Sequence, residues 1–227
     1  SMDGKHPMFV ATKEQNQQPI LILDKNGMIG PLLAEKMQEH FMVILVSGKD
    51  LLLQKNILSV PYHRRIPLIP DNSYKAMILF YSGDDTLFEL LPKILEKAQT
   101  LHAKVLFVTS VRLASEKVIR KLEKQQFSNL QLVVYGDLFY PEDIVDNPVN
   151  YFLHQATAHG KITLVDDGIG GIYPIALADV LSGIVSIAFS HNKQRLIYLF
   201  AKTPISDLSI ARVLKKHNPL LKIDFKK

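Results

Sequence analysis

The segment that most constrains the fold of this 227-residue chain is residues 19–40. A short apolar run at 20–23 is followed by a turn containing Gly27 and Gly30, and an amphipathic segment begins at Pro31. A buried strand, a glycine turn and a helix in this order open a βαβ unit, in which a helix connects two parallel strands. The segment therefore predicts an α/β protein built on a parallel sheet.

The same turn is a candidate phosphate-binding corner. Glycines let the backbone approach a pyrophosphate, and the helix N-terminus presents free N–H groups and a partial positive charge. In a G-x-x-G-x-x-G spacing, Gly27 and Gly30 take the second and third positions with Met28 and Ile29 between them, but the first position holds Asp24. We expect a carboxylate there to repel a pyrophosphate and to crowd the turn. The residues thus predict a nucleotide-binding fold in which the Asp24 carboxylate disfavours binding of the nucleotide.

The rest of the chain alternates apolar segments with amphipathic ones, which is typical of a doubly wound sheet. We expect strands at 20–23, 41–46, 65–70, 75–81, 104–108, 130–135, 162–165 and 197–200. We expect helices at 31–40, 51–58, 86–101, 114–126, 150–159, 175–188 and 206–217. Residues 1–18 are polar and aperiodic and are predicted to form a flexible N-terminal arm. Residues 19–227 are predicted to form one Rossmann-like unit.

Composition narrows the class further. Hydrophobic residues make up 47% and charged residues 22% of the chain, which is normal for a globular protein. No run of about eighteen uncharged apolar residues is present, so no membrane span is predicted. Cysteine is absent, which excludes disulfides and thiol nucleophiles and favours a cytoplasmic location. The net charge of +5 comes largely from C-terminal lysines without interleaved aromatic residues, so no nucleic-acid partner is predicted.

The order of these motifs resembles the extended short-chain dehydrogenase/reductase family, especially its nucleotide-sugar epimerases and dehydratases. The resemblance covers most of residues 20–225. It rests on the glycine turn, on Ser82-Gly83 after the fourth strand, and on the segments 133–141, 160–168, 175–180 and 202–206. It implies a Rossmann-like doubly wound parallel sheet with a reduced C-terminal substrate-like region.

This resemblance also implies a cofactor and a ligand. NAD or NADP would be the cofactor, a nucleotide sugar would be the ligand, and no metal is implied. The residues at the family's cofactor-binding positions are Gly27, Met28, Ile29, Gly30, Ser47, Ser82 and Gly83. Ser47 stands near the place where the family usually has an acidic or basic residue that contacts the adenosine ribose, so this contact is weakened.

The chain departs from the family in the catalytic part. The family uses a Ser or Thr and then Tyr-x-x-x-Lys, in which the lysine lowers the tyrosine pKa and the tyrosine transfers a proton during hydride transfer. Here Thr109 and Ser110 end the matching strand, and if Arg112 takes the lysine's place, Val108 takes the tyrosine's. Valine transfers no proton, and arginine is a poor substitute for lysine.

The leading hypothesis is therefore a degenerate relative of these enzymes. It would bind or scaffold without redox chemistry, in nucleotide-sugar or polysaccharide metabolism, as a domain of a larger protein. In one alternative, the protein is an active, atypical NAD(P)-dependent epimerase or reductase acting on a nucleotide sugar, with Asp24 turned away from the phosphate and Tyr135 or Tyr140 as the acid. In another, it is an interaction module that forms a homodimer through the helices after Thr86 and around Ala114.

Two pairs of acidic residues follow predicted strands. Asp84-Asp85 and Asp166-Asp167 are residue types that bind a divalent metal or perform acid–base chemistry. Aspartate is also favoured at helix N-termini and in turns, and this second interpretation is preferred at both places. No metal site is predicted.

Overall fold

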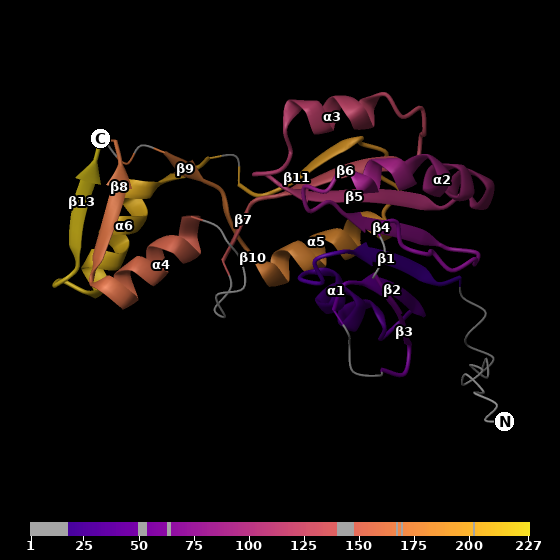
Figure 1. Ribbon diagram of the computed structural model, residues 1–227, viewed down its shortest axis with the longest axis horizontal. Helices are drawn as coiled ribbons and strands as arrows, with labels where there is room; N and C mark the ends of the chain where they lie inside the picture. The colour runs from indigo at the N-terminus through magenta and orange to yellow at the C-terminus, as the bar shows by residue number, and fades with distance from the viewer. Residues whose placement is uncertain are drawn as a thin grey trace.

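The computed structural model describes residues 18–49, 54–62, 65–139, 148–166, 168, 170–201 and 203–227. Within these ranges, a seven-stranded parallel sheet lies between helices, and a smaller C-terminal lobe lies at one end of this body (Figure 1). The predicted fold class, an α/β Rossmann-like doubly wound parallel sheet, is confirmed.

The order of the strands creates a crevice at one edge of the sheet. The strands are β1 (Ile20–Asp24), β2 (Val43–Ser47), β3 (Ile57–Pro61), β4 (Ala76–Phe80), β5 (Lys104–Ser110), β6 (Leu130–Tyr135) and β11 (Leu196–Leu199). They lie in the order β11-β6-β5-β4-β1-β2-β3, so the direction of winding reverses between β1 and β4. In open α/β sheets, ligands bind outside the carboxyl ends of the strands at such a reversal.

Helices cover both faces of the sheet, which explains why its central strands are apolar throughout. The helices are α1 (Gly30–Met37), α2 (Thr86–Leu101), α3 (Glu116–Glu123) and α5 (Leu177–Phe189). α1 and α5 pack on the face that carries Ile20 and Ile22. α2 and α3 pack on the opposite face, which carries Leu21 and Leu23 (Figure 1).

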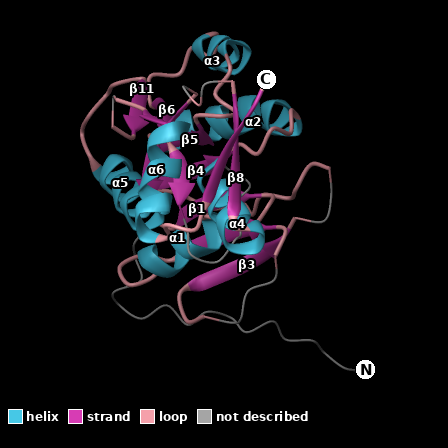
Figure 2. Ribbon diagram, turned by 90° about the vertical axis from the view of Figure 1, so that its left-hand side faces the viewer, coloured by secondary structure: helices cyan, strands magenta, loops and turns pink. Residues whose placement is uncertain are grey.

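The C-terminal lobe has its own small core. It contains α4 (Pro148–His159), β8 (Lys161–Val165), α6 (Asp207–His217) and β13 (Lys222–Lys226), and it faces the viewer in Figure 2. Its buried side chains are Phe152, Ile162, Leu164, Ala211 and Leu221. β8 and β13 pair in parallel over their full lengths, and each supplies apolar side chains to this core.

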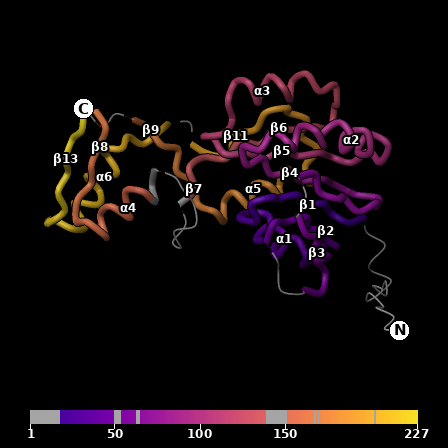
Figure 3. The backbone as a smooth tube through the Cα atoms, in the orientation of Figure 1, coloured from indigo at the N-terminus to yellow at the C-terminus, as the bar shows by residue number. Residues whose placement is uncertain are grey.

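Two short ribbons connect the lobe to the sheet. β7 (Asp137–Phe139) pairs in parallel with β10 (Pro174–Ala176), and β9 (Gly171–Ile172) pairs antiparallel with β12 (Ile205–Ser206). The chain enters the lobe after β7, returns to the sheet through β9 and β10 to form α5 and β11, and re-enters the lobe with α6 and β13 (Figure 3). The lobe is therefore assembled from segments that are separated by part of the sheet.

The structure corrects the sequence prediction around the third strand. Residues 65–70 do not form a strand, because Pro67 and Pro70 have no N–H to donate to a ladder. The third strand is β3, which pairs with β2 at the edge of the sheet. The predicted helix at 51–58 is wrong at its C-terminal part, and residues 50–53 lie outside the described residues. The strands β7, β9, β10, β12 and β13 were not predicted.

The surface bears on two other expectations. No helix of the described residues is long and apolar enough to cross a membrane. The outward faces of α2 and α3 carry polar side chains such as Glu89, Glu96 and Arg120. A homodimer through these helices stays a prediction, and an interface there would be polar.

Gly136, between β6 and β7, provides a test of the connection to the lobe. An alanine Cβ at this position would lie 2.1 Å from the carbonyl oxygen of Tyr173, so Gly136→Ala must push the ribbon away from β6. We expect a loss of about 3 kcal/mol in the free energy of unfolding, measured by urea denaturation. Gly160→Ala is the matched control, because its φ is +60° but its Cβ would meet nothing within 4 Å. That variant should lose only about 1 kcal/mol, and equal losses would contradict the prediction.

Candidate functional site

A crevice of about 370 Å³ lies at the carboxyl ends of β1, β4, β5 and β6. Its polar side chains include Asp24, Asn26, Ser82, Ser110, Arg112, Tyr135 and Asp137. Its apolar side chains include Met28, Ile29, Phe80, Leu113 and Leu138. It therefore lies at the reversal of the winding, where this type of sheet binds ligands.

Strand register explains why three of these polar side chains lie together. Successive residues of a strand point to opposite faces of the sheet. Ile20 and Ile22 point to the face that α1 and α5 cover, so Asp24 does too. Ser110 is directly paired with Tyr135, and both continue the same face beyond the buried residues Val108 and Val133. The crevice thus lies where the apolar core between the sheet and helices α1 and α5 ends in polar side chains.

Asp24 occupies the N-terminus of α1. Its Oδ2 accepts a hydrogen bond from the backbone N–H of Gly30 at 2.7 Å, and only 3% of the residue is exposed. Burial raises the pKa of Asp24, while the backbone N–H groups of Gly30, Gly27, Met28 and Ile29 oppose the shift by stabilising the carboxylate. The carboxylate therefore takes the position at which a helix N-terminus would receive the anion of a ligand.

Gly30 and Gly27 are required by the chain's own side chains. A Cβ on Gly30 would lie 2.5 Å from the Cβ of Asp24. Gly27 has a φ of +64°, and a Cβ there would lie 2.7 Å from Cγ of Lys49 and 2.9 Å from Oγ of Ser47. Ser47 itself is buried at the end of β2, where its Oγ accepts a hydrogen bond from the backbone N–H of Lys49 at 3.2 Å. Of the residues in this turn, Asn26, Met28 and Ile29 line the crevice.

The residues at the other family positions divide into two groups. Ser82 and Ser110 line the crevice. Gly83 lies in the turn after β4 with a φ of +91°. Thr109 is fully buried, and its hydroxyl donates a hydrogen bond to the carbonyl oxygen of Tyr81 at 3.4 Å. Thr109 therefore faces away from the crevice, and Ser110 is the hydroxyl that strand β5 presents to a ligand.

Arg112 forms the wall of the crevice nearest the lobe. Its Nε and Nη2 bind the two carboxylate oxygens of Asp137 at 2.7 and 2.8 Å, and Nη2 also donates to the carbonyl oxygen of Gly171 at 3.3 Å. Asp137 also accepts a hydrogen bond from the backbone N–H of Tyr173 at 2.9 Å. Arg112 thus links the body to both ribbons of the lobe, and two of its three nitrogens are engaged by the protein.

Two tyrosines line the crevice, Tyr81 and Tyr135, and burial raises the pKa of both. Tyr135 is the one that the sequence proposed as an acid. Burial raises its pKa far above the ordinary value, and the negative charge of Asp24 raises it further. A tyrosine that transfers a proton near neutral pH needs the opposite shift. Tyr135 therefore stays protonated. The other candidate, Tyr140, lies outside the described residues.

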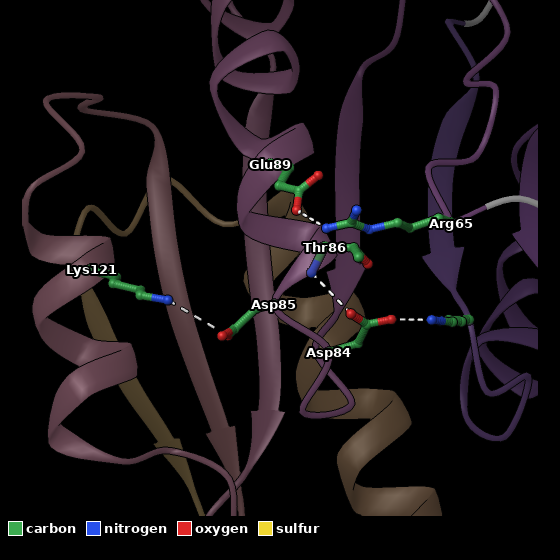
Figure 4. Close-up of polar contacts among 7 residues, drawn as sticks. Arg65, Asp84, Asp85, Thr86, Glu89 and Lys121 are labelled. Atoms are coloured by element: carbon green, nitrogen blue, oxygen red, sulfur yellow. Dashed lines mark hydrogen bonds and ion pairs between the residues drawn. The ribbon is translucent and has the colours of Figure 1, made fainter.

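The acidic pair after β4 stabilises the start of α2 (Figure 4). Asp84 forms an ion pair with Lys25, and its Oδ1 accepts a hydrogen bond from the backbone N–H of Thr86 at 3.0 Å. These contacts lower the pKa of Asp84 to about 2. Asp85 points to the other side of the helix, where Lys121 lies 3.6 Å away. The pair serves the helix and the packing around it, as the preferred interpretation predicts.

The other acidic pair lies in a turn. Asp166 follows β8 with a φ of +51°, and Asp167 lies outside the described residues. Among the residues that the structure describes, no group of three or more His, Cys, Asp or Glu side chains is placed to hold a metal ion.

Asp137 was not identified as a site residue from the sequence. The signal was present, because an aspartate directly after Gly136 follows one of the most apolar strands of the chain. Its partners, Arg112 and Tyr173, are 25 and 36 residues away along the chain. A contact of that separation depends on the folded topology, which local patterns do not report.

No protein-family model and no curated protein matches the sequence. Solved structures do match. The ADP-L-glycero-D-manno-heptose-6-epimerase of Helicobacter pylori superposes with a TM-score of 0.69 at 17% identity, over 96% of this chain and 88% of that chain. The dTDP-glucose 4,6-dehydratase of Bacillus anthracis in complex with NAD gives a TM-score of 0.63 at 13% identity, over 93% and 86%.

An enzyme that acts on an amino acid has a similar fold. The L-threonine dehydrogenase of Phytophthora infestans gives a TM-score of 0.65 at 14% identity, over 92% of this chain and 84% of that chain. At these identities the likeness shows the fold alone. The chain has the Rossmann-like fold of NAD-dependent nucleotide-sugar epimerases and dehydratases, as the resemblance implied.

The two helix-start aspartates should respond to pH in opposite directions. The pKa of Asp24 is raised on folding, so its favourable contribution to stability is lost as pH rises from about the ordinary value of 3.8 through the raised pKa. The pKa of Asp84 is lowered to about 2, so its contribution is present above 3.8 and is lost as pH falls toward 2. Urea denaturation across pH, with Asp24→Asn and Asp84→Asn each compared with the wild type, isolates the two effects. Differences with the same sign would contradict this assignment.

The Arg112–Asp137 pair should contribute strongly to stability. Arg112→Met leaves the Asp137 side chain, which is 1% exposed, without its charged partner. We expect a loss of about 3 kcal/mol in the free energy of unfolding, at the lower end for a buried pair because Arg112 is half-exposed. Arg65→Met is the control, because the Arg65–Glu89 pair is exposed and should contribute less than about 1 kcal/mol. Similar losses in the two variants would show that Asp137 does not depend on Arg112.

Proposed function

We propose that this protein is a non-catalytic ligand-binding protein of nucleotide-sugar or polysaccharide metabolism. It keeps the crevice of the epimerase fold but does not carry out hydride transfer. The observation that carries the proposal is the Asp24 carboxylate at the N-terminus of α1, bound to the N–H of Gly30.

This carboxylate opposes a dinucleotide in two ways. The pyrophosphate of NAD would need the same backbone N–H groups, and these already stabilise Asp24. Two anions close together in a poorly solvated corner also repel each other strongly. The residues of the corner therefore do not fit the pyrophosphate.

The groups at the catalytic positions support the same conclusion. Val108, at the place of the family's tyrosine, is fully buried in the sheet. Arg112, at the place of the lysine, is bound to Asp137. Tyr81 and Tyr135, the tyrosines among the described lining residues, both have a pKa raised by burial and so resist deprotonation. A hydride transfer at a sugar carbon needs a group that exchanges a proton with the substrate, and these side chains do not supply one.

The crevice still suits the sugar part of a ligand. Ser82, Ser110 and Tyr135 bring hydroxyl groups to it, and Phe80 and Leu113 bring apolar surface. Binding sites for small molecules combine such surfaces with a few polar groups that orient the ligand. Proteins of similar fold are named as a heptose epimerase and a glucose dehydratase, which supports a sugar as the ligand class.

Calorimetric titration with NAD, NADH, NADP, NADPH and UDP-glucose tests the proposal. We expect no dinucleotide binding to the wild type, and no hydride transfer when a dinucleotide and UDP-glucose are mixed with it. Asp24→Gly removes the charge and supplies the missing first glycine, so this variant should gain measurable affinity for NAD. Asp85→Asn, which changes an aspartate at the start of α2 instead, should gain none.

The opposite result would favour the alternative function. Micromolar binding of NAD or NADP to the wild type, lost in Gly27→Glu, would show that the corner accepts a pyrophosphate despite Asp24. Turnover of a nucleotide sugar by the same protein would establish an active, atypical NAD(P)-dependent epimerase or reductase.

A further inference from the structure

We infer that the crevice selects its ligand by charge: it binds a sugar that carries an amine, binds a neutral sugar more weakly, and rejects a phosphorylated one. This inference rests on the proposed function, in which the crevice takes a sugar-type ligand without a dinucleotide. A phosphate-binding corner prefers anions, and this crevice would prefer cations. The reason is that the groups of the crevice that could bind an anion already bind carboxylates of the protein.

The described groups that would attract an anion are engaged by the protein. The N-terminal amides of α1 stabilise Asp24, with the Gly30 N–H at 2.7 Å from its Oδ2. Arg112 directs Nε and Nη2 to Asp137 and Gly171. A phosphate would have to displace an internal carboxylate at either place, and each displacement would leave a buried charge without its partner.

The charges around the crevice add up to a negative site. Asp24 and Asp137 line it, and Arg112 is the cation among its described lining residues. Asp207 interacts with the same arginine and is partly buried beside it. The carboxylates thus outnumber the guanidinium. Lys25 lies next to this region, but its charge is matched by that of Asp84.

The negative field reaches the part of the crevice where a ligand would lie. Tyr135 lines the crevice at the end of β6, and the charge of Asp24 acts on its hydroxyl from the end of β1. β4 and β5 lie between β1 and β6 in the sheet, so the effect of Asp24 spans the width of the crevice. An ammonium group on a ligand in this space would gain from the same field, and a phosphate would lose.

The remaining polar groups suit hydroxyls. Ser82, Ser110 and Tyr135 each offer an O–H, and Tyr135 keeps its proton. These groups donate and accept hydrogen bonds without favouring either sign of charge. They would hold a sugar ring, while the carboxylates distinguish between its substituents.

Three sugars with the same ring and different charges test the inference. Glucosamine, glucose and glucose 6-phosphate are titrated into the wild type near pH 7 and at low salt, where the amine is mostly protonated and the pH lies well above the ordinary pKa of a carboxyl group. Binding is followed by the amide NMR signals of the crevice, which report weak affinity and its location. We expect glucosamine to bind at least about fivefold more tightly than glucose, and glucose 6-phosphate at least about fivefold more weakly. Added salt should reduce both differences.

Two variants locate the source of the selectivity. Asp24→Asn removes one charge with little change of shape, and it should reduce the preference for glucosamine over glucose. Glu89→Gln removes a charge that pairs with Arg65 on the exposed side of α2, outside the lining of the crevice, so it should preserve the full order. Thermal unfolding of each variant confirms that the fold is intact before titration.

The outcomes separate this inference from the proposed function. Equal affinities, tighter binding of glucose 6-phosphate, or no binding of any of the three sugars would overturn the charge selectivity. The proposed lack of redox chemistry would survive each of these results if dinucleotides still fail to bind. Binding and turnover of NAD with a nucleotide sugar would instead overturn the proposed function itself.

Discussion

The hydrogen bond between the Asp24 carboxylate and the N-terminus of α1 determines the character of this crevice. A helix N-terminus carries unsatisfied N–H groups and a partial positive charge, which something must satisfy. In a dinucleotide-binding corner the ligand does so. Here a side chain of the preceding strand does so, and the turn depends on it, because Gly30 packs against Asp24 with no room for a Cβ. The Asp24 carboxyl group is thus a built-in part of the turn.

A second interaction within the protein, between Arg112 and Asp137, lies at the wall of the crevice nearest the lobe. Arg112 extends from the end of β5 to Asp137 and to the Gly171 carbonyl, which belong to different ribbons of the lobe. The resemblance implies that Arg112 takes the place of the lysine that holds the cofactor in that family. An arginine with a planar fork of donors is better suited to a bidentate carboxylate than to that role. Arg112 is part of the connection between body and lobe.

The sequence reveals some of these features and conceals others. The runs 130–135 and 86–101 coincide with β6 and α2, because continuous apolar runs and amphipathic periodicity are local signals. Asp24 is conspicuous for the same reason, since it interrupts a local glycine spacing. The edge strand β3 was missed because its burial is patchy. The Arg112–Asp137 pair was missed because β5 and β6 bring it together only when the sheet has formed.

The two helix-start aspartates show how burial decides what a carboxylate does. Asp84 starts α2 near the surface, and Lys25 neutralises it, so its charge is local to that helix. Asp24 starts α1 in the interior, where backbone dipoles rather than a cation stabilise it. Backbone N–H groups hold a carboxylate in place but leave its net charge in the crevice, and low polarisability around it lets that charge act over a longer range. In the proposed function, this charge opposes an anion at the position where a helix N-terminus would otherwise receive one.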